Sequence, residues 1–301
     1  MSVESDTATA AKRPYSSLCI ICGDEGTKTL GRLLTSVLRR GHGPLVDEIV
    51  VGWNGGDTGA FLRALSGGEV ARLNTAAPDG ADPETGKVSG VWTIEGVPVT
   101  VAKQEWKSDF AAVRQQTFEA ASGVWRGYLD TDDVVPDPTR PDDLAAIHAS
   151  LVASGVEVKG EDTASAGPVG QPKSFNDYLR SLPPAANCLI LPYDYTIGGD
   201  GRALERHPRR RFVRWNDGWV WKAREYYHED MIPVGGCRQV LVFNAALPIR
   251  HYPSEPVESR TARNRSILKR MIEEVDKGER PADARLDYNL ATFAMQDGDS
   301  E

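Results

Sequence analysis

The order of apolar runs near the N-terminus limits the possible folds of this chain more than any other feature. An apolar run from Leu18 to Cys22 is followed by the glycine-containing segment Gly23 to Gly26. Apolar residues then recur at helical spacing up to Leu38, and Gly41 stops the helix. A second apolar run covers residues 46–51. Strand, loop, helix and strand predict a βαβ unit, which places ligands outside the carboxyl ends of its parallel strands.

The rest of the chain continues this alternation of strands and helices. Period-two and period-3.6 patterns, with glycine and proline between them, set the expected boundaries. We expect strands at 91–94, 97–102, 124–129 and 189–195, helices at 109–122 and twice within 139–181, a hairpin turn at 198–201, and two helical stripes at 267–275 and 286–293. The predicted fold class is α/β, a mainly parallel sheet flanked by helices, with a C-terminal helix pair.

Composition excludes several classes of protein. A chain of 301 residues that is 40% hydrophobic can bury a full core. Four cysteines form no disulfide framework and indicate a reducing, cytoplasmic compartment, and the Cys19 and Cys22 pair lies in an apolar run typical of a buried strand. No run is long and apolar enough for a membrane span, so we expect no membrane role. A formal net charge of −8 disfavours binding to duplex nucleic acid.

Three aspartates follow the apolar strand predicted at 124–129. Asp130, Asp132 and Asp133 lie within four residues, so their repulsion must be offset. Hard cations such as Mg²⁺ or Mn²⁺ do this with carboxylate and diphosphate oxygens. If the strand continues through them, Asp130 and Asp132 point to the same side. The alternative is a solvated acidic turn before Pro136.

The segment from Trp106 to Asp133 closely resembles the core signature of glycosyltransferase family 2. It contains Asp-Phe-Ala-x-x-Arg at a helix start, a glycine before a strand, and a DxD motif at the strand end. Gly23 to Gly26, the second strand and Asp57 resemble the opening βαβ unit of the same family, so the resemblance covers residues 17–137. It implies a GT-A (Rossmann-like) fold, a nucleoside-diphosphate sugar as donor, with a UDP-sugar as the default, and Mn²⁺ or Mg²⁺ as cofactor.

The resemblance assigns roles on the donor side. His251 resembles a histidine that can complete the metal site, and Arg114, near the positive end of its helix, could counter phosphate charge. Asp109 could also be only the N-cap of that helix, and Arg114 only a solvated arginine. The implied metal ligands are Asp130, Asp132, Asp133 and His251. The implied nucleotide-sugar contacts are Gly23, Asp24, Glu25, Trp53, Asn54, Asp57, Asp109, Arg114, Asp130 and Thr131.

One position departs from the family pattern. Many members carry an aspartate that contacts the nucleobase at the end of the second strand, where this chain has Gly52. A glycine has no side chain to accept a hydrogen bond from the base. Trp53 or Asn54 could read the base instead, or both could be loop packing residues.

The second half of the chain supplies the candidate base. The stretches from Arg211 to Arg214 and from Trp219 to Trp221, followed by His228 to Asp230, resemble the acceptor side of the family. An inverting transferase needs a carboxylate to deprotonate the acceptor. Glu229 is the first candidate, and Asp230 and Glu225 are its rivals. Each could instead be an exposed acid on a loop, and the five arginines in 206–214 could bind an anion or line a solvated strand face.

The predicted function is a metal-dependent, inverting hexosyl or pentosyl transfer to a soluble acceptor. The acceptor could be a protein or peptide, a small metabolite or a modified (hydroxymethylated) DNA base. The alternatives are a nucleotidyltransferase acting on a sugar phosphate and a catalytically silent sugar- or nucleotide-binding protein. The predicted domains are a disordered tail at 1–14, a GT-A domain at 15–255 and a helical appendage at 256–301. The appendage resembles a tetratricopeptide unit and could pair two copies of the chain.

Overall fold

The centre of the molecule is a group of parallel strands in a larger mixed sheet. The computed structural model describes residues 13–68, 72–78, 88–107, 109–153, 174–225, 228–253 and 257–279. An 11-stranded sheet has the order β3-β4-β5-β2-β1-β6-β9-β8-β13-β7, with β12 beside β8, and β10 and β11 form a second sheet. The strands of the 11-stranded sheet are β1 (Ser16–Cys22), β2 (Glu48–Trp53), β3 (Thr75–Ala76), β4 (Gly90–Ile94), β5 (Val97–Lys103), β6 (Trp125–Tyr128), β7 (Asp133–Val134), β8 (Cys188–Ile197), β9 (Ala203–Arg214), β12 (Leu241–Phe243) and β13 (Ile249–His251). The two-stranded sheet is β10 (Trp219–Glu225) with β11 (His228–Pro233).

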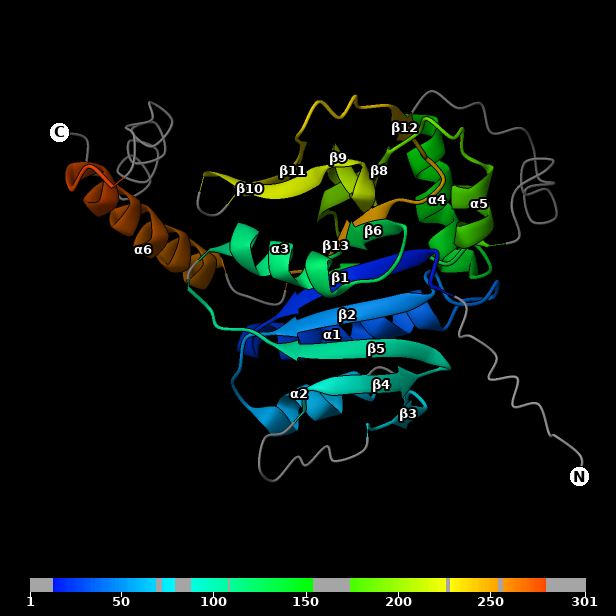
Figure 1. The fold of residues 1–301 in the computed structure, drawn as a ribbon. Coiled ribbons are helices and arrows are strands. Elements are labelled where there is room, and N and C mark those ends of the chain that lie inside the picture. The colour runs from blue at the N-terminus through cyan, green and yellow to red at the C-terminus, as the bar shows by residue number, and fades with distance from the viewer. Residues whose placement is uncertain are drawn as a thin grey trace, which may run out of the picture.

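Helices cover both faces of the central strands. Leu18 and Ile20 of β1 join the apolar cluster that contains the buried face of α1, whereas Cys19 joins the cluster of α3. Alternate side chains of a strand point to opposite faces, so α1 and α3 lie on opposite sides of the sheet (Figure 1). The helices are α1 (Asp24–Leu38), α2 (Thr58–Leu65), α3 (Phe110–Ala120), α4 (Pro141–Ala153), α5 (Phe175–Ser181) and α6 (Val257–Asp276), with a 3₁₀ turn at Trp215–Asp217.

The predicted βαβ unit is confirmed, and its two strands end together. β1 pairs in parallel with β2, and Cys22 lies opposite Trp53. β6 pairs in parallel with the other side of β1, and β5 with the other side of β2. The predicted α/β class is therefore confirmed, and the carboxyl ends of these four strands meet at one edge.

The other half of the sheet is built from a hairpin. β8 and β9 are antiparallel, and Gly201 in their connection has a φ of 78°, a left-handed conformation that glycine adopts without strain. β9 pairs with β6, while β13 pairs in parallel with β8. The hairpin predicted from the 198–201 turn is confirmed, and it joins the antiparallel strands to the parallel centre.

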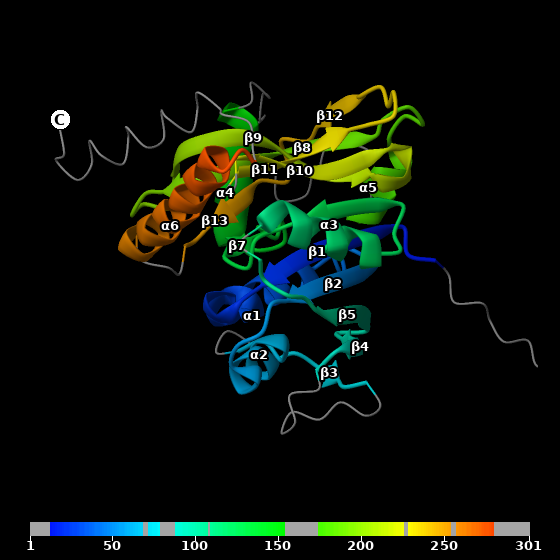
Figure 2. The ribbon, with the colours of Figure 1, turned by 60° about the vertical axis from the view of Figure 1, so that its left-hand side comes forward.

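The first helix of the predicted C-terminal pair packs on the main body. Ile267, Leu268 and Met271 of α6 are buried and form a cluster with Phe110 at the start of α3. The ribbons of α6 and α3 lie near each other in Figure 1 and Figure 2. The second predicted helix, at 286–293, and residues 1–12 of the predicted tail lie outside the described residues. Among the described residues, no helix has the length and apolar character needed to cross a membrane.

Candidate metal and donor site

The three aspartates lie in a tight turn at the end of β6. The Asp133 backbone N–H donates to the Asp130 carbonyl at 3.0 Å, and the Asp130 N–H donates to Asp133 Oδ2 at 3.0 Å. The strand ends at Tyr128, before the aspartates. The strand therefore does not continue through Asp130 and Asp132, and strand alternation does not place them on one side. Hydrogen bonds within the turn replace the pairing between strands.

Two of these carboxylates meet an imidazole. Ligand atoms of Asp132, Asp133 and His251 all lie within 4.8 Å of one another. The antiparallel pairing of β13 with β7 places His251 opposite Asp133. His251 Nδ1 is 3.5 Å from Asp132 Oδ1 and 3.4 Å from Asp133 Oδ1. Two carboxylates and an imidazole are a suitable donor set for Mn²⁺, so these residues fit the expected metal.

The electrostatics of this group favour a positive charge between the carboxylates. Burial lowers the pKa of His251, but the nearby carboxylates of Asp132 and Asp133 outweigh burial and raise the pKa to about 9. An imidazolium at this place would compete with a divalent cation for the same two carboxylates. A metal would have to displace the imidazolium proton on binding.

Asp133 is held by residues from the second half of the chain. Its side chain is fully buried, the Tyr193 hydroxyl donates to Oδ1 at 3.1 Å, and Arg211 Nη2 lies 3.5 Å from Oδ2. Burial and the nearby Asp130 charge raise the pKa of Asp133 above its usual range, although Arg211 opposes this. The Tyr195 ring stacks on His251 with centroids 5.4 Å apart. The orientation of the group is therefore fixed from β8 and β9.

Asp130 is placed apart from this group. Its Oδ1 accepts from Arg114 Nη2 at 2.5 Å. Burial raises the pKa of Asp130, but the charges of Arg114 and Arg211 outweigh burial and lower it to about 2. The structure brings Asp132, Asp133 and His251 together, while the first aspartate of the motif pairs with a buried arginine. Metal ligation by Asp130 stays a prediction.

The first base candidate reaches the same arginine. Glu229 in β11 accepts from Arg114 Nε through Oε1 at 2.5 Å. The rings of Tyr128 and Trp221 lie under the Arg114 guanidinium, with centroids 4.6 and 5.3 Å away. Glu229 is therefore a partly buried residue next to the aspartate turn, not the exposed loop acid of the alternative.

The rival base candidates lie elsewhere or are not described. Asp230 accepts from Arg210 Nη1 at 2.7 Å. Glu225 is the last residue of β10, and its side chain lies outside the described residues. The arginines of 206–214 do not form one anion-binding face. Arg206 pairs with Asp194, Arg210 with Asp230 and Arg211 with Asp133, Arg214 donates to the Pro184 carbonyl, and Arg209 is exposed.

The loops after β1 and β2 place the other donor candidates at the same edge. Asp24 starts α1, and its Oδ1 accepts from the Asp57 N–H at 3.0 Å. Asp57 in turn caps α2 by accepting from the Ala60 N–H at 3.0 Å. Glu25 is exposed and pairs with Lys28, and Gly23 occupies the N-cap position of α1. These residues have structural partners, and nucleotide contacts by them stay predictions.

Thr131 and Asn54 also lie at this edge of the sheet. A Cβ on Gly26 would be 3.0 Å from Thr131 Oγ1, so the aspartate turn lies directly against the start of α1. The Asn54 N–H donates to the Cys22 carbonyl at 2.9 Å. Asn54 Oδ1 is buried and has no hydrogen-bond partner among the described residues. This geometry leaves both residues able to contact a nucleotide, and such a contact stays a prediction.

The Trp53 and Gly52 positions are filled by protein packing. Trp53 is 3% exposed and stacks on Phe61 with centroids 4.9 Å apart, so the packing alternative describes it and its ring presents no face to a base. A Cβ on Gly52 would lie 2.2 Å from Gln104 Oε1 and 2.6 Å from Thr117 Oγ1. The Gln104 amide, which donates to Thr117 at 3.0 Å, thus occupies the space in which the family aspartate would lie.

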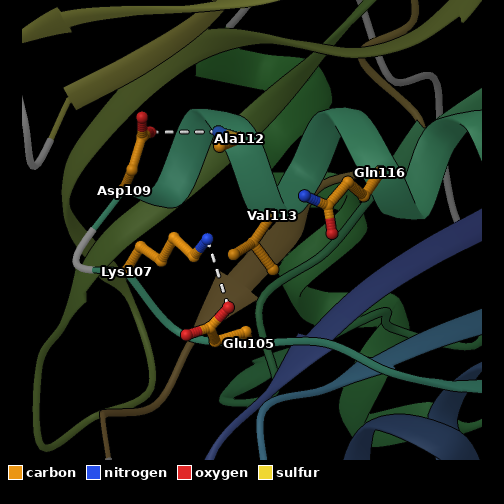
Figure 3. A pocket seen from close by; sticks show the side chains of 6 residues that line it. All are labelled: Glu105, Lys107, Asp109, Ala112, Val113 and Gln116. Carbon is orange, nitrogen blue, oxygen red and sulfur yellow. Dashed lines mark hydrogen bonds and ion pairs between the residues drawn. The ribbon is translucent and has the colours of Figure 1, made fainter.

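A hollow lies beside the start of α3. It has a volume of about 220 Å³ and lies between residues 105–107 and α3 (Figure 3). Asp109 lines it and caps α3 by accepting from the Ala112 N–H at 3.0 Å, as the N-cap alternative expects. Glu105 and Lys107 pair with each other at 3.1 Å on its other side (Figure 3).

Two residues of the site, Tyr193 and Gln104, were not expected from the sequence. Tyr193 donates to Asp133, and Gln104 fills the Gly52 position. Tyr193 belongs to an apolar strand whose alternation shows only that it points inward. Gln104 follows a strand and has no motif around it. Both residues could have been predicted only with knowledge of which distant segments of the chain pair with each other.

The fold and the site define an α/β protein with a carboxylate and imidazole group at the carboxyl ends of parallel strands. No protein-family model and no curated protein matches the chain. The solved structure of S. aureus TarS is 13% identical, covering 93% of this chain and 42% of that chain with a TM-score of 0.38. GalNAc-T7 with UDP, GalNAc and Mn²⁺ is 14% identical, covering 80% and 44%, with a TM-score of 0.38. This chain spans less than half of either protein, and scores this low carry no argument about its function.

Proposed function

We propose that this protein is a GT-A type glycosyltransferase that moves a sugar from a nucleoside diphosphate to a soluble acceptor. The observation that carries the proposal is the convergence of Asp132, Asp133 and His251 within 4.8 Å at the carboxyl edge of the parallel strands. The family 2 motif order in residues 17–137 also supports it, because the DxD pair of Asp130 and Asp132 supplies one of these residues and Asp133 directly follows that pair.

The three converging residues would hold Mn²⁺ or Mg²⁺, which would neutralise charge on the departing diphosphate. The acceptor atom forms a bond to the anomeric carbon while the bond from that carbon to the diphosphate oxygen breaks. The electron pair of the broken bond leaves with the diphosphate, and the acceptor proton passes to Glu229. The contacts of Glu229 among the described residues engage Oε1, which leaves Oε2 for the proton.

The alternative functions find less support. A nucleotidyltransferase typically has basic residues in the loop after the first strand, whereas here Asp24 and Glu25 form the first turn of α1. The silent binding protein predicts nucleotide binding without turnover. Neither alternative accounts for the ion pair of Glu229 with Arg114 beside the aspartate turn.

The test is release of nucleoside diphosphate from UDP-, GDP-, CDP- and ADP-sugars with Mn²⁺ and a panel of hydroxyl acceptors. We expect one base to support turnover, and Glu229→Gln to lower kcat on the order of 100 to 10,000-fold through loss of the base. Asp217→Asn is the matched control, because Asp217 lies far from the site. It belongs to the turn after Arg214, and Arg214 pairs with Trp125, at the end of β6 opposite to Asp130. Undiminished turnover by Glu229→Gln would remove Glu229 as the base, and no turnover with any donor would contradict the proposal.

A further inference from the structure

Arg114 contacts candidate residues on both sides of the site. It is 4% exposed, and its Nη2 and Nε donate to Asp130 Oδ1 and Glu229 Oε1, each at 2.5 Å. Asp130 belongs to the turn that carries the metal candidates, and Glu229 belongs to the separate sheet of β10 and β11. One guanidinium therefore bridges the donor side and the acceptor side.

The position of Glu229 depends on α3. β11 pairs only with β10 among the described strands, so the main sheet does not fix it. The small sheet instead packs on α3, where the Trp221 N–H donates to Gln115 Oε1 at 2.9 Å and Trp221 contacts Phe118 with centroids 5.3 Å apart. Arg114 adds a second polar link to this contact, and it reaches directly to the Glu229 carboxylate.

The charge of Arg114 is already used by protein groups. An arginine guanidinium is ionised at any working pH. Two carboxylates share this one cation, and the rings of Tyr128 and Trp221 lie under it. The Nη2 and Nε donors are thus taken by protein carboxylates. Nη1 is buried and has no hydrogen-bond partner among the described residues, so it is the donor left for the diphosphate role that the family resemblance implies.

We propose that Arg114 is a positioning residue that holds the Glu229 carboxylate at a fixed place relative to the aspartate turn. This inference rests on the proposed function, because it concerns the placement of the base. A planar guanidinium with donors in two directions can orient two carboxylates at once, which a lysine ammonium does not do in a fixed geometry. Arg114 then acts on the rate of transfer and not on the affinity for the donor.

The first test separates rate from donor binding. Arg114→Lys and Arg114→Gln should lower kcat on the order of 100-fold, the usual cost of a misplaced reacting group. Their affinity for Mn²⁺ with the nucleoside diphosphate, measured by calorimetry, should stay near the wild-type value. Arg126→Gln is the matched control, because Arg126 is 6% exposed and donates to the backbone carbonyls of Phe118 and Gly123. It should lower stability and leave kcat near the wild-type value.

The second test does not depend on turnover. Urea unfolding of Arg114→Gln, Glu229→Gln and the double variant forms a cycle. We expect the double variant to be about as destabilised as Arg114→Gln alone, since the partner of the second change is already gone. Additive losses would overturn the bridge, and lost diphosphate affinity with unchanged kcat would overturn the positioning role in favour of phosphate binding. The cycle could show that Arg114 and Glu229 are coupled while the wild-type protein turns over no donor. The bridge would then be purely structural, and this result would contradict the proposed function itself.

Discussion

At the scale of single residues, the hydroxyl of Tyr193 is the clearest example of a contact that supports the metal candidates. It is the side-chain hydroxyl that donates to the fully buried Asp133, at 3.1 Å from Oδ1. Groups that orient a metal ligand affect metal affinity nearly as much as the ligands do. The site therefore extends beyond the three residues that would touch the cation.

Removing this hydroxyl should weaken metal binding. We expect Tyr193→Phe to lower Mn²⁺ affinity by about 10 to 100-fold, because Asp133 loses a donor that fixes its orientation. It should also lower the free energy of unfolding by about 1 to 3 kcal/mol. Calorimetry with Mn²⁺ and urea unfolding measure the two effects. Tyr195→Phe is the control, because its ring stacks on His251 and no described residue bonds its hydroxyl; an equal loss in both variants would refute the role of the Tyr193 hydroxyl.

The residues of the site differ in how far the sequence could predict them. Asp132, Asp133 and His251 were expected as metal ligands from a motif and a resemblance, and the structure brings them together. The Arg114 bridge to Glu229 was not expected, because it joins residues separated by 115 positions. The apolar periodicity of α3 predicts which side of the helix faces inward, but it does not predict which strand packs there.

At the scale of elements, the turn after β7 connects the end of α1 to the start of α4. Asp137 is 4% exposed, and it accepts from the Gly41 N–H at 3.0 Å and from the Thr139 N–H and hydroxyl at 3.0 and 2.8 Å. Burial raises the pKa of Asp137, but the hydrogen bonds from Thr139 and Gly41 outweigh it and lower the pKa. The ionised carboxylate therefore holds this junction together.

The lowered pKa of Asp137 predicts a dependence of stability on pH. A carboxyl whose pKa is lower in the folded state stabilises the protein above its unfolded pKa of about 3.9, and this contribution is lost as the pH falls through the folded value. Asp137→Asn should cost about 1 to 3 kcal/mol at neutral pH and should flatten the decline of the free energy of unfolding below about pH 4. Urea unfolding across this pH range measures it. With the exposed Asp217→Asn as control, an unchanged decline in Asp137→Asn would contradict the prediction.

Element types were more predictable than element ends. The helix at α3 and the hairpin of β8 and β9 follow from periodicity and from glycine at a turn. The expected strand at 46–51 instead lies at Glu48–Trp53, because pairing of Cys22 with Trp53 extends it beyond the apolar run. β7 and β13 are only two and three residues long, and their pairing cannot be recognised without the sheet around them.

At the scale of the whole molecule, the site forms where the two halves of the sheet meet. The parallel half delivers Asp130 to Asp133 at the end of β6, and the antiparallel half delivers His251, Tyr193 and Arg211. The small sheet of β10 and β11 then brings Glu229 against α3. Division into a domain at 15–255 and an appendage at 256–301 stays a prediction, while α6 packs on the start of α3.

The measurement that tests the central claim most directly is calorimetric titration of Mn²⁺ and nucleoside diphosphates into the wild type and Asp132→Asn, with Asp217→Asn as control. The account predicts that one diphosphate among UDP, GDP, CDP and ADP binds only with Mn²⁺, and that Asp132→Asn loses this binding while Asp217→Asn keeps it. Binding that is independent of Mn²⁺, or equal in Asp132→Asn and the wild type, would contradict the account and leave the aspartates with a structural role only.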